Sequence, residues 1–193
     1  MTGFIAALVV FAAIGWLVLQ LVQVDQEEGE RRTRSALAIW LLSFFHANTV
    51  VSAAFTDLAR LDLPRTPLLI VGLAIAAAGW VVFIRATLTL VREGGFRGLE
   101  TTRLVTQGLF GVVRHPQALG WTMLLLGVAI ASRSAIGFVF VVAYGLFAAR
   151  FARLEEQQLR ERFGDEYERY AERVPGLWPS RGSGQRPAAP VEA

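Results

Sequence analysis

Two stretches decide how the chain is interpreted: GLFGVVRHPQALG, from Gly108 to Gly120, and RLEEQQLRERFGDEY, from Arg153 to Tyr167. Between them lie two apolar segments that are separated only by Ser-Arg-Ser at residues 132–134, and this pattern predicts a tight helical hairpin. A hairpin returns the chain to the side from which it came, and each helical residue adds about 1.5 Å of rise. We therefore expect both polar stretches to lie at the same face of a membrane.

The composition of the chain indicates a membrane protein. Of its 193 residues 54% are hydrophobic, and the mean hydropathy of +0.46 is higher than that of an ordinary soluble domain. The chain has no cysteine and only two histidines, so we expect neither a disulfide nor a metal site. Its arginines flank apolar segments, which favours contact with a lipid bilayer over binding of nucleic acid.

Five apolar segments predict the membrane-embedded part. Three of them, at 3–24, 35–55 and 67–91, are long enough to cross about 30 Å of hydrocarbon as helices. The hairpin segments at 118–132 and 135–149 are shorter, so they either cross a thinned bilayer or form a re-entrant pair. Within the second segment, His46 and Asn48 are polar and lie mid-span, where we expect interhelical hydrogen bonds.

The carboxyl-terminal part is more polar than the apolar segments before it. Apolar residues recur there at spacings of three and four on a charged background, which predicts an amphipathic helix that Gly164 can break. Residues 180–193 are rich in Pro, Gly, Ser and Ala and are predicted to be disordered. The predicted fold class is therefore all-α: a polytopic membrane protein with about five transmembrane or hairpin helices and a C-terminal interfacial amphipathic helix.

The distribution of arginine predicts the orientation in the membrane. With five spans, only three arginines fall on one side of the bilayer, whereas the other side carries those near residues 31–34, 92–114 and from 150 onward. The positive-inside rule places the arginine-rich side in the cytoplasm. We thus expect a multi-pass protein of the cytoplasmic membrane, with its amino terminus outside and with its carboxyl terminus and both polar stretches in the cytoplasm.

The polar stretches carry the residues that are suited to bind a ligand. Pro116 is favourable in the first turn of a helix, so His115 is a plausible cap, and the free N–H groups of that turn attract an anion. Arg114 adds a donor for a carboxylate or phosphate, whereas Glu155 and Glu156 accept from an ammonium, a ribose hydroxyl or an adenine amine. S-adenosylmethionine has both kinds of group, but so have many polar metabolites. The plain alternative is a membrane anchor beside a solvated helix face.

The segment 104–179 resembles the isoprenylcysteine carboxyl methyltransferases and the wider group of membrane methyltransferases that includes phospholipid and thiol methyltransferases. The resemblance follows the order Leu-x-Thr-x-Gly, Val-Arg-His-Pro-x-Tyr-x-Gly, Arg-x-Glu-Glu-x-x-Leu, Phe-Gly-x-x-Tyr-x-x-Tyr and Val-Pro. The matching positions are Leu104, Thr106, Gly108, Val113, Arg114, His115, Pro116, Gly120, Arg153, Glu155, Glu156, Leu159, Phe163, Gly164, Tyr167, Tyr170, Val174 and Pro175.

The resemblance implies a division into N-terminal transmembrane helices at 1–103, a cofactor-binding half at 104–179 and a tail at 180–193. It also implies that S-adenosylmethionine binds near the cytoplasmic surface and that a lipophilic small-molecule or lipid-linked substrate enters from the bilayer. The residues expected to bind the cofactor are Gly108, Arg114, His115, Pro116, Gly120, Glu155 and Glu156. Those expected to act in catalysis are Arg153 and Glu156.

The individual roles are assigned as follows. Arg114 and His115 are expected at the cofactor carboxylate, and the two glutamates at its ammonium or nucleoside end. Arg153 either orients a substrate carboxylate or pairs with Glu156 or Gln157. Gly108 and Gly120 allow close approach of a ligand or of another helix.

Two departures from the pattern bear on the substrate. The tyrosine after Arg-His-Pro is Ala118 here, and the usual Pro-Tyr after the first glycine is Leu109-Phe110. The methyl acceptor stays open among a prenylated cysteine, a phospholipid amine, a small thiol and an isoprenoid acid. Two other classes also stay open. One is an NADPH-dependent membrane reductase of the sterol reductase type, whose carboxyl-terminal patterns are similar, and the other is a non-enzymatic scaffold with a degenerate site.

Overall fold

The computed structural model describes residues 2–27, 33–56, 59–94 and 103–177, and this part of the chain is helical throughout its regular structure. The predicted all-α class is therefore confirmed. The elements in chain order are α1 (Thr2–Glu27), α2 (Thr33–Ala54), α3 (Arg65–Arg92), the short 3₁₀ helix η1 (Gly108–Gly111), α4 (Pro116–Ser132), α5 (Ala135–Phe163) and α6 (Asp165–Arg173).

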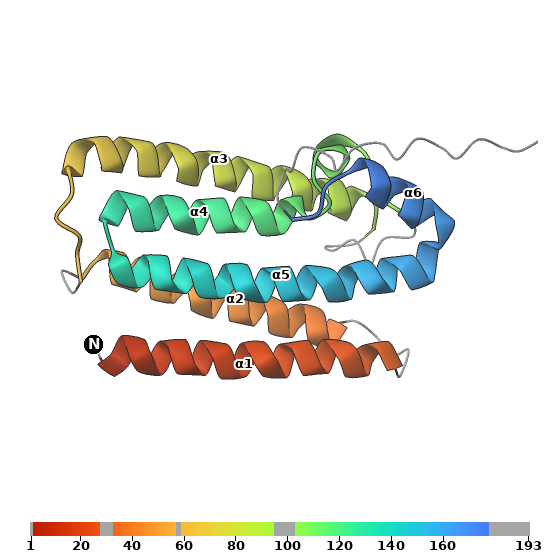
Figure 1. Ribbon diagram of the computed structural model, residues 1–193, viewed down its shortest axis with the longest axis horizontal. Coiled ribbons are helices and arrows are strands. Elements are labelled where there is room, and N and C mark those ends of the chain that lie inside the picture. The colour runs from red at the N-terminus through yellow and green to blue at the C-terminus, as the bar shows by residue number, and fades with distance from the viewer. Residues whose placement is uncertain (1, 28–32, 57–58, 95–102, 178–193) are drawn as a thin grey trace, which may run out of the picture.

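The axes of the helices α1 to α5 are roughly aligned, and each of these helices runs antiparallel to the α-helix before it (Figure 1). The α2–α3 connection, the α4–α5 turn and the amino terminus lie at one end of this bundle. The start of α4, the end of α5 and α6 lie at the opposite end. The sequence-based prediction that the hairpin brings both polar stretches together is confirmed.

Among the residues that the structure describes, three helices are long and apolar enough to cross a membrane, at Thr2–Leu21, Arg65–Arg92 and Ala135–Phe163. Shorter apolar helices lie at Ala38–Ala54 and Pro116–Ser132. Large apolar side chains cover the outer surface of the bundle, for example Leu73 in α3, which is 58% exposed, and Leu146 in α5, which is 71% exposed. Such a surface is suited to contact with lipid rather than water.

The turn between α4 and α5 is built from the predicted Ser-Arg-Ser tripeptide. Arg133 ends α4 in the left-handed conformation, with φ of 58°, and Ser134 caps α5 by accepting a hydrogen bond from the Gly137 N–H at 3.0 Å. The Arg133 guanidinium also donates to the Leu63 carbonyl at 2.8 Å. These contacts fix the hairpin and tie it to the α2–α3 connection.

The closest helix packing occurs between α3 and α4, at two glycine pairs. Gly72 faces Gly127, and Gly79 faces Gly120, so that the backbones touch without intervening side chains. A Cβ added to Gly120 would lie 2.5 Å from the Phe83 backbone nitrogen. Of the two uses that the sequence left open for Gly120, the structure therefore shows close helix packing, and its predicted contact with a cofactor stays a prediction.

Replacing Gly120 with alanine should destabilise the protein, because the added methyl group would force α3 and α4 apart. We expect a loss of about 1–3 kcal/mol in the free energy of unfolding, the usual cost of overpacking. The matched control is Gly145→Ala in α5, where an added Cβ meets no atom within 4 Å. That control should be neutral or slightly stabilising. Denaturant unfolding in detergent would measure both variants, and equal stability would contradict the packing interpretation.

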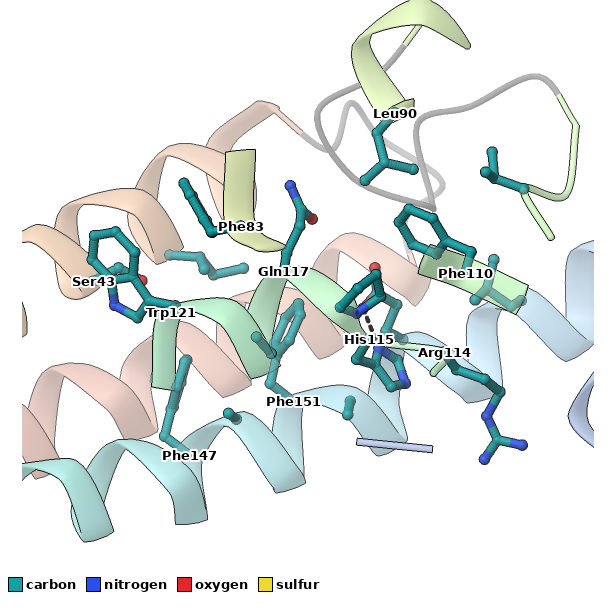
Figure 2. A pocket seen from close by; sticks show the side chains of 18 of the residues that line it. Ser43, Phe83, Leu90, Phe110, Arg114, His115, Gln117, Trp121, Phe147 and Phe151 are labelled. Carbon is teal, nitrogen blue, oxygen red and sulfur yellow. Dashed lines mark ion pairs between the residues drawn. The ribbon is translucent and has the colours of Figure 1, made fainter. Parts of the chain in front are cut away.

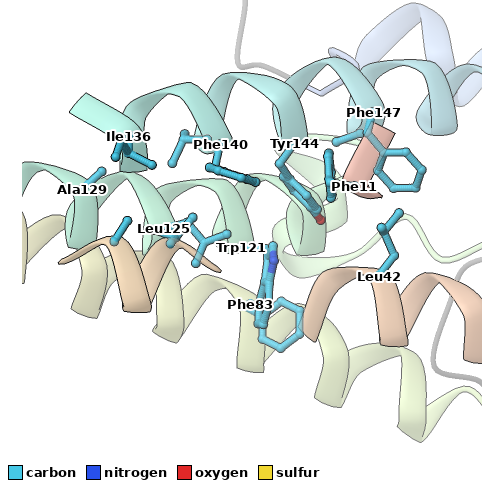
Figure 3. Packing of buried hydrophobic residues seen from close by; sticks show 14 of the residues in the cluster. Phe11, Leu42, Phe83, Trp121, Leu125, Ala129, Ile136, Phe140, Tyr144 and Phe147 are labelled. Carbon is cyan, nitrogen blue, oxygen red and sulfur yellow. The ribbon is translucent and has the colours of Figure 1, made fainter. Parts of the chain in front are cut away.

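The two mid-span polar residues of α2 behave differently. Nε2 of His46 lies 2.6 Å from the Phe140 carbonyl oxygen in α5, so the predicted interhelical hydrogen bond is confirmed for this residue. His46 also stacks on Tyr144, a residue of the packed core that Figure 3 shows. Asn48 donates to the Phe44 carbonyl one turn earlier in α2, so the prediction of an interhelical bond is wrong for Asn48.

The amphipathic C-terminal helix is confirmed, and Gly164 breaks it at a positive φ of 49°. On either side of the break, Leu159, Tyr167, Tyr170 and Val174 form a buried cluster. The Tyr170 hydroxyl donates to the Phe110 carbonyl at 2.7 Å, which joins α6 to η1. The predicted disorder of residues 180–193 lies outside the described residues.

Candidate functional site

The site begins at Arg114, whose guanidinium contacts the carboxyl-terminal part of the chain. Its guanidinium contacts Oε1 of Glu156 through Nε at 3.0 Å and through Nη2 at 2.9 Å. Its Nη1 donates to the carbonyls of Ala171 at 2.9 Å and Val174 at 3.2 Å. Arg114 therefore joins α5 to the end of α6 and caps carbonyls that have no partner within that helix.

The backbone of Arg114 holds the residues after α6 as well. Its N–H lies within hydrogen-bond distance of two carbonyl oxygens, at 2.9 Å from Pro175 and 3.2 Å from Gly176. We name residues 171–177 the C-terminal strap. Figure 1 shows that the chain turns back after α6 and reaches the start of α4. The strap is thus fastened to the Arg-His-Pro turn by main-chain and side-chain bonds together.

His115 connects the two glutamates. It occupies the N-cap position of α4, as predicted, but its side chain makes no capping bond. Instead Nδ1 lies 3.2 Å from Oε2 of Glu155, and Nε2 lies 3.0 Å from Oε1 of Glu156. An imidazole can donate from both nitrogens only when it is protonated. The geometry is therefore that of an imidazolium held between two carboxylates.

The electrostatics of His115 agree with this geometry. Burial of the ring favours the neutral form and would by itself lower the pKa of His115. Hydrogen bonds and charges from Glu155 and Glu156 outweigh burial and raise the pKa to about 9, from an ordinary value of 6.5. His115 is consequently charged at neutral pH.

A cavity opens beside this charged cluster, between α2, α3, α4, α5 and α6. It includes about 1050 Å³ of empty space, part of which is open solvent. Arg114 and His115 mark its polar end, at the right of Figure 2. Glu155, which contacts His115, and Tyr167 also line the cavity. Its other end is formed mainly by apolar and aromatic side chains, which include Ile39, Trp40, Phe83, Trp121, Phe147 and Phe151.

The two glutamates differ in position. Glu155 lines the cavity, whereas Glu156 lies beside it and is engaged by Arg114 and His115, with Arg160 at 3.9 Å. Both were predicted to bind a cofactor, and Glu156 also to act in catalysis. The structure brings both of them to the predicted place, and Glu155 is the one that faces the space where a ligand would bind.

The other predicted residues are distributed unevenly. Pro116 is buried in the first turn of α4 and lines the cavity. Gly108 begins η1 at a positive φ of 60° and is exposed, outside the lining. Arg153 is also exposed and outside the lining, so its expected role in catalysis has no contact with the cavity to support it. The roles of these residues stay predictions.

Two of the lining residues that were not predicted as site residues carry a buried polar atom without a hydrogen-bond partner among the described residues. Tyr167 is fully buried, and within the described chain its hydroxyl has no hydrogen-bond partner. Trp121 is 7% exposed, and its indole nitrogen is likewise unpartnered there. Tyr167 belongs to the Phe-Gly-x-x-Tyr-x-x-Tyr pattern, which could have indicated it. Trp121 stands in an apolar helix and carries no comparable signal.

Comparison with known proteins gives this geometry a context. The sequence model of the phospholipid methyltransferase family matches residues 67–166, which is more than half of the 193-residue chain. The chain belongs to the phospholipid methyltransferase family. Methyltransferases of this family use S-adenosylmethionine. The matched region covers α3, η1, α4, α5 and the Arg-His-Pro and Glu-Glu elements of the site.

One curated relative is Protein-S-isoprenylcysteine O-methyltransferase B of Arabidopsis thaliana, which is 38% identical over 79 residues. The aligned part amounts to 39% of this chain and 39% of the relative, so the chain matches about two fifths of the relative's length. No solved structure matches the chain. The family is thus shown by sequence, and the present geometry shows how the residues of the candidate site are arranged.

The raised pKa of His115 predicts how stability depends on pH. The folded state holds a proton more tightly than the unfolded state, so its stability is fully present below about pH 6.5 and is lost as the pH rises through about 9. The loss should be at most roughly 3 kcal/mol. Denaturant unfolding between these pH values would measure it. The same series on His115→Gln should be flatter, and parallel curves for the two proteins would contradict a charged His115.

Proposed function

We propose that this protein is an integral membrane methyltransferase that transfers a methyl group from S-adenosylmethionine to a lipophilic acceptor. One observation carries the proposal: a single cavity is charged at one end and aromatic at the other, and it lies within a bundle whose outer surface is apolar. Such a cavity can hold a polar donor and an apolar acceptor in contact with each other. Membership of the methyltransferase family supplies the reaction class.

The residues at the charged end fit the methyl donor. The Glu155 carboxylate suits an ammonium group or a ribose hydroxyl, and the buried hydroxyl of Tyr167 can donate to or accept from a ligand. Arg114 is less available than the sequence suggested, because its side chain is bonded to Glu156 and to the strap. We therefore assign ligand contact to Glu155 and Tyr167, and the positioning of Glu155 to His115, Arg114 and Glu156.

The reaction itself requires little chemistry from the protein. When bound, the sulfonium group of the donor supplies an electrophilic methyl carbon, which an acceptor lone pair attacks while the carbon–sulfur bond electrons pass to sulfur. The chain must align the two reactants and exclude water. Tyr167 and Tyr170 of α6 line the cavity together with the charged residues, and aromatic side chains line its other end.

Proton balance depends on the acceptor. A carboxylate attacks without losing a proton, whereas a thiol or an amine must lose one. His115 cannot take that proton while both of its nitrogens are bonded to carboxylates. Within the charged cluster, Glu155 both lines the cavity and has oxygens that can accept a proton.

We also propose that the charged end faces the cytoplasm. Arg92, Arg103, Arg114 and Arg150 belong to the end of the bundle that holds the strap, while Arg60, Arg65 and Arg133 lie at the other end. The positive-inside rule then places the amino terminus outside the cytoplasmic membrane. Labelling of single cysteines introduced at residues 3 and 173 in intact cells would test this, and labelling of residue 173 from outside would contradict it.

The donor site can be tested by titration of the detergent-purified protein with S-adenosylmethionine and, separately, with NADPH. We expect saturable binding of S-adenosylmethionine, weakened about 10- to 100-fold by Glu155→Gln because a hydrogen bond to a charged group is lost. Glu172→Gln, an exposed position in α6, is the control and should bind normally. Binding of NADPH instead would indicate a reductase, and binding of neither would leave a non-enzymatic scaffold.

A further inference from the structure

The aromatic end of the cavity contains a hydrogen-bond donor, the indole N–H of Trp121, that the proposed S-adenosylmethionine site does not use. Trp121 in α4 is 7% exposed and lines the cavity, and its Nε1–H has no hydrogen-bond partner among the described residues. A buried donor that is left without a partner costs about 1–3 kcal/mol. Buried tryptophans usually have a partner for this group. A polar atom of a ligand in the cavity would supply it.

The surroundings of Trp121 make this end otherwise apolar. Its ring lies 5.1 Å from the Phe83 ring, between centroids, and Phe147 lines the same end. Ser43 of α2 is also buried there, and Figure 2 shows it with Trp121 at the end of the cavity away from His115 and Arg114. In Figure 3 the Tyr144 hydroxyl is turned toward the Trp121 ring. Polar groups from α2, α4 and α5 thus line the same cavity.

The spacing along α4 sets a distance between the two polar regions. Trp121 follows His115 by six positions, which corresponds to about 9 Å of helical rise. Ala118 stands midway between them in sequence and also lines the cavity. The methyltransferase pattern has a tyrosine at that position, and alanine fills less of the cavity.

We propose that Trp121 is a specificity-determining residue that binds a carbonyl oxygen of the methyl acceptor, about 9 Å from the end that receives the methyl group. The inference rests on the proposed function, because it takes the charged cluster as the place of transfer. An indole N–H can only donate a hydrogen bond, so the bound molecule must present a hydrogen-bond acceptor. The methyl acceptor is then a long-chain amphiphile with a mid-chain carbonyl group, rather than one whose chain is hydrocarbon throughout.

The test compares two probes that differ only in the carbonyl group. One is hexadecanediol with both hydroxyls at one end, and the other is the same diol with a ketone about 9 Å from the hydroxyls. The full chain would be held in an alkyl maltoside, whose tails carry no carbonyl. Wild-type protein should bind the ketone diol roughly fivefold more tightly, as expected for one net hydrogen bond.

Trp121→Phe keeps the aromatic wall and removes the N–H group. This variant should bind the two diols equally, and its affinity for the plain diol should equal that of the wild type. Trp80→Phe is the control, since Trp80 is 47% exposed and lies outside the lining, and it should keep the preference. In indole-labelled wild-type protein, the Trp121 N–H resonance should move downfield with the ketone diol alone. This measurement decides the matter even if Trp121→Phe does not fold.

Equal binding of the two diols by the wild type, or binding of neither, would overturn the proposal. A preference that survives in folded Trp121→Phe would overturn it as well. Titration with S-adenosylmethionine on the same sample keeps the two proposals apart. If S-adenosylmethionine does not bind but the ketone preference is intact, only the proposed function is contradicted. If S-adenosylmethionine binds normally and the ketone preference is absent, only the role of Trp121 is contradicted.

Discussion

The site depends on one ion cluster, in which Arg114 and His115 at the start of α4 meet Glu155 and Glu156 in α5. A single carboxylate oxygen, Oε1 of Glu156, receives Nε and Nη2 of Arg114 and Nε2 of His115 at distances of 2.9–3.0 Å. Because these groups are largely buried, each charge is stable only while its partners are in place. Loss of one member would leave the others as uncompensated charges, so the cluster acts as a unit.

The helical framework makes this cluster possible. The Ser-Arg-Ser turn fixes the hairpin at the far end of the bundle, and the glycine pairs bring α4 against α3. With both constraints, the Arg-His-Pro turn lies beside Glu155 and Glu156, two turns before the end of the long helix α5. Beyond the cluster, α5 continues into α6, and the strap then returns to the start of α4 (Figure 1).

Much of this arrangement follows from the sequence, because apolar length, turn residues and charge spacing are local signals. The hairpin at residues 132–134, the break at Gly164 and the placement of both polar stretches at one end of the bundle were predictable in that way. The ion pairs of Arg114 and His115 with the glutamates were not, because these residues were expected at opposite ends of a cofactor. Other features were not predictable either. Adjacent residues of a helix point about 100° apart, so whether Glu155 or Glu156 faces the cavity depends on how α5 is rotated in the bundle. The partners of Arg114 in the strap are main-chain carbonyls, which every residue has, so no pattern of side chains indicates them.

The way in which the strap is held also affects which sequence changes it can accept during evolution. Arg114 binds the carbonyl oxygens of Ala171 and Val174 and its N–H lies near those of Pro175 and Gly176, so exposed side chains in that stretch could change without loss of the attachment. Two positions are constrained: the Val174 side chain is buried, and a Cβ at Gly176 would lie 3.2 Å from Nη2 of Arg114. We therefore expect an ending whose sequence diverges between relatives except for one apolar and one small residue, although its backbone path is essential.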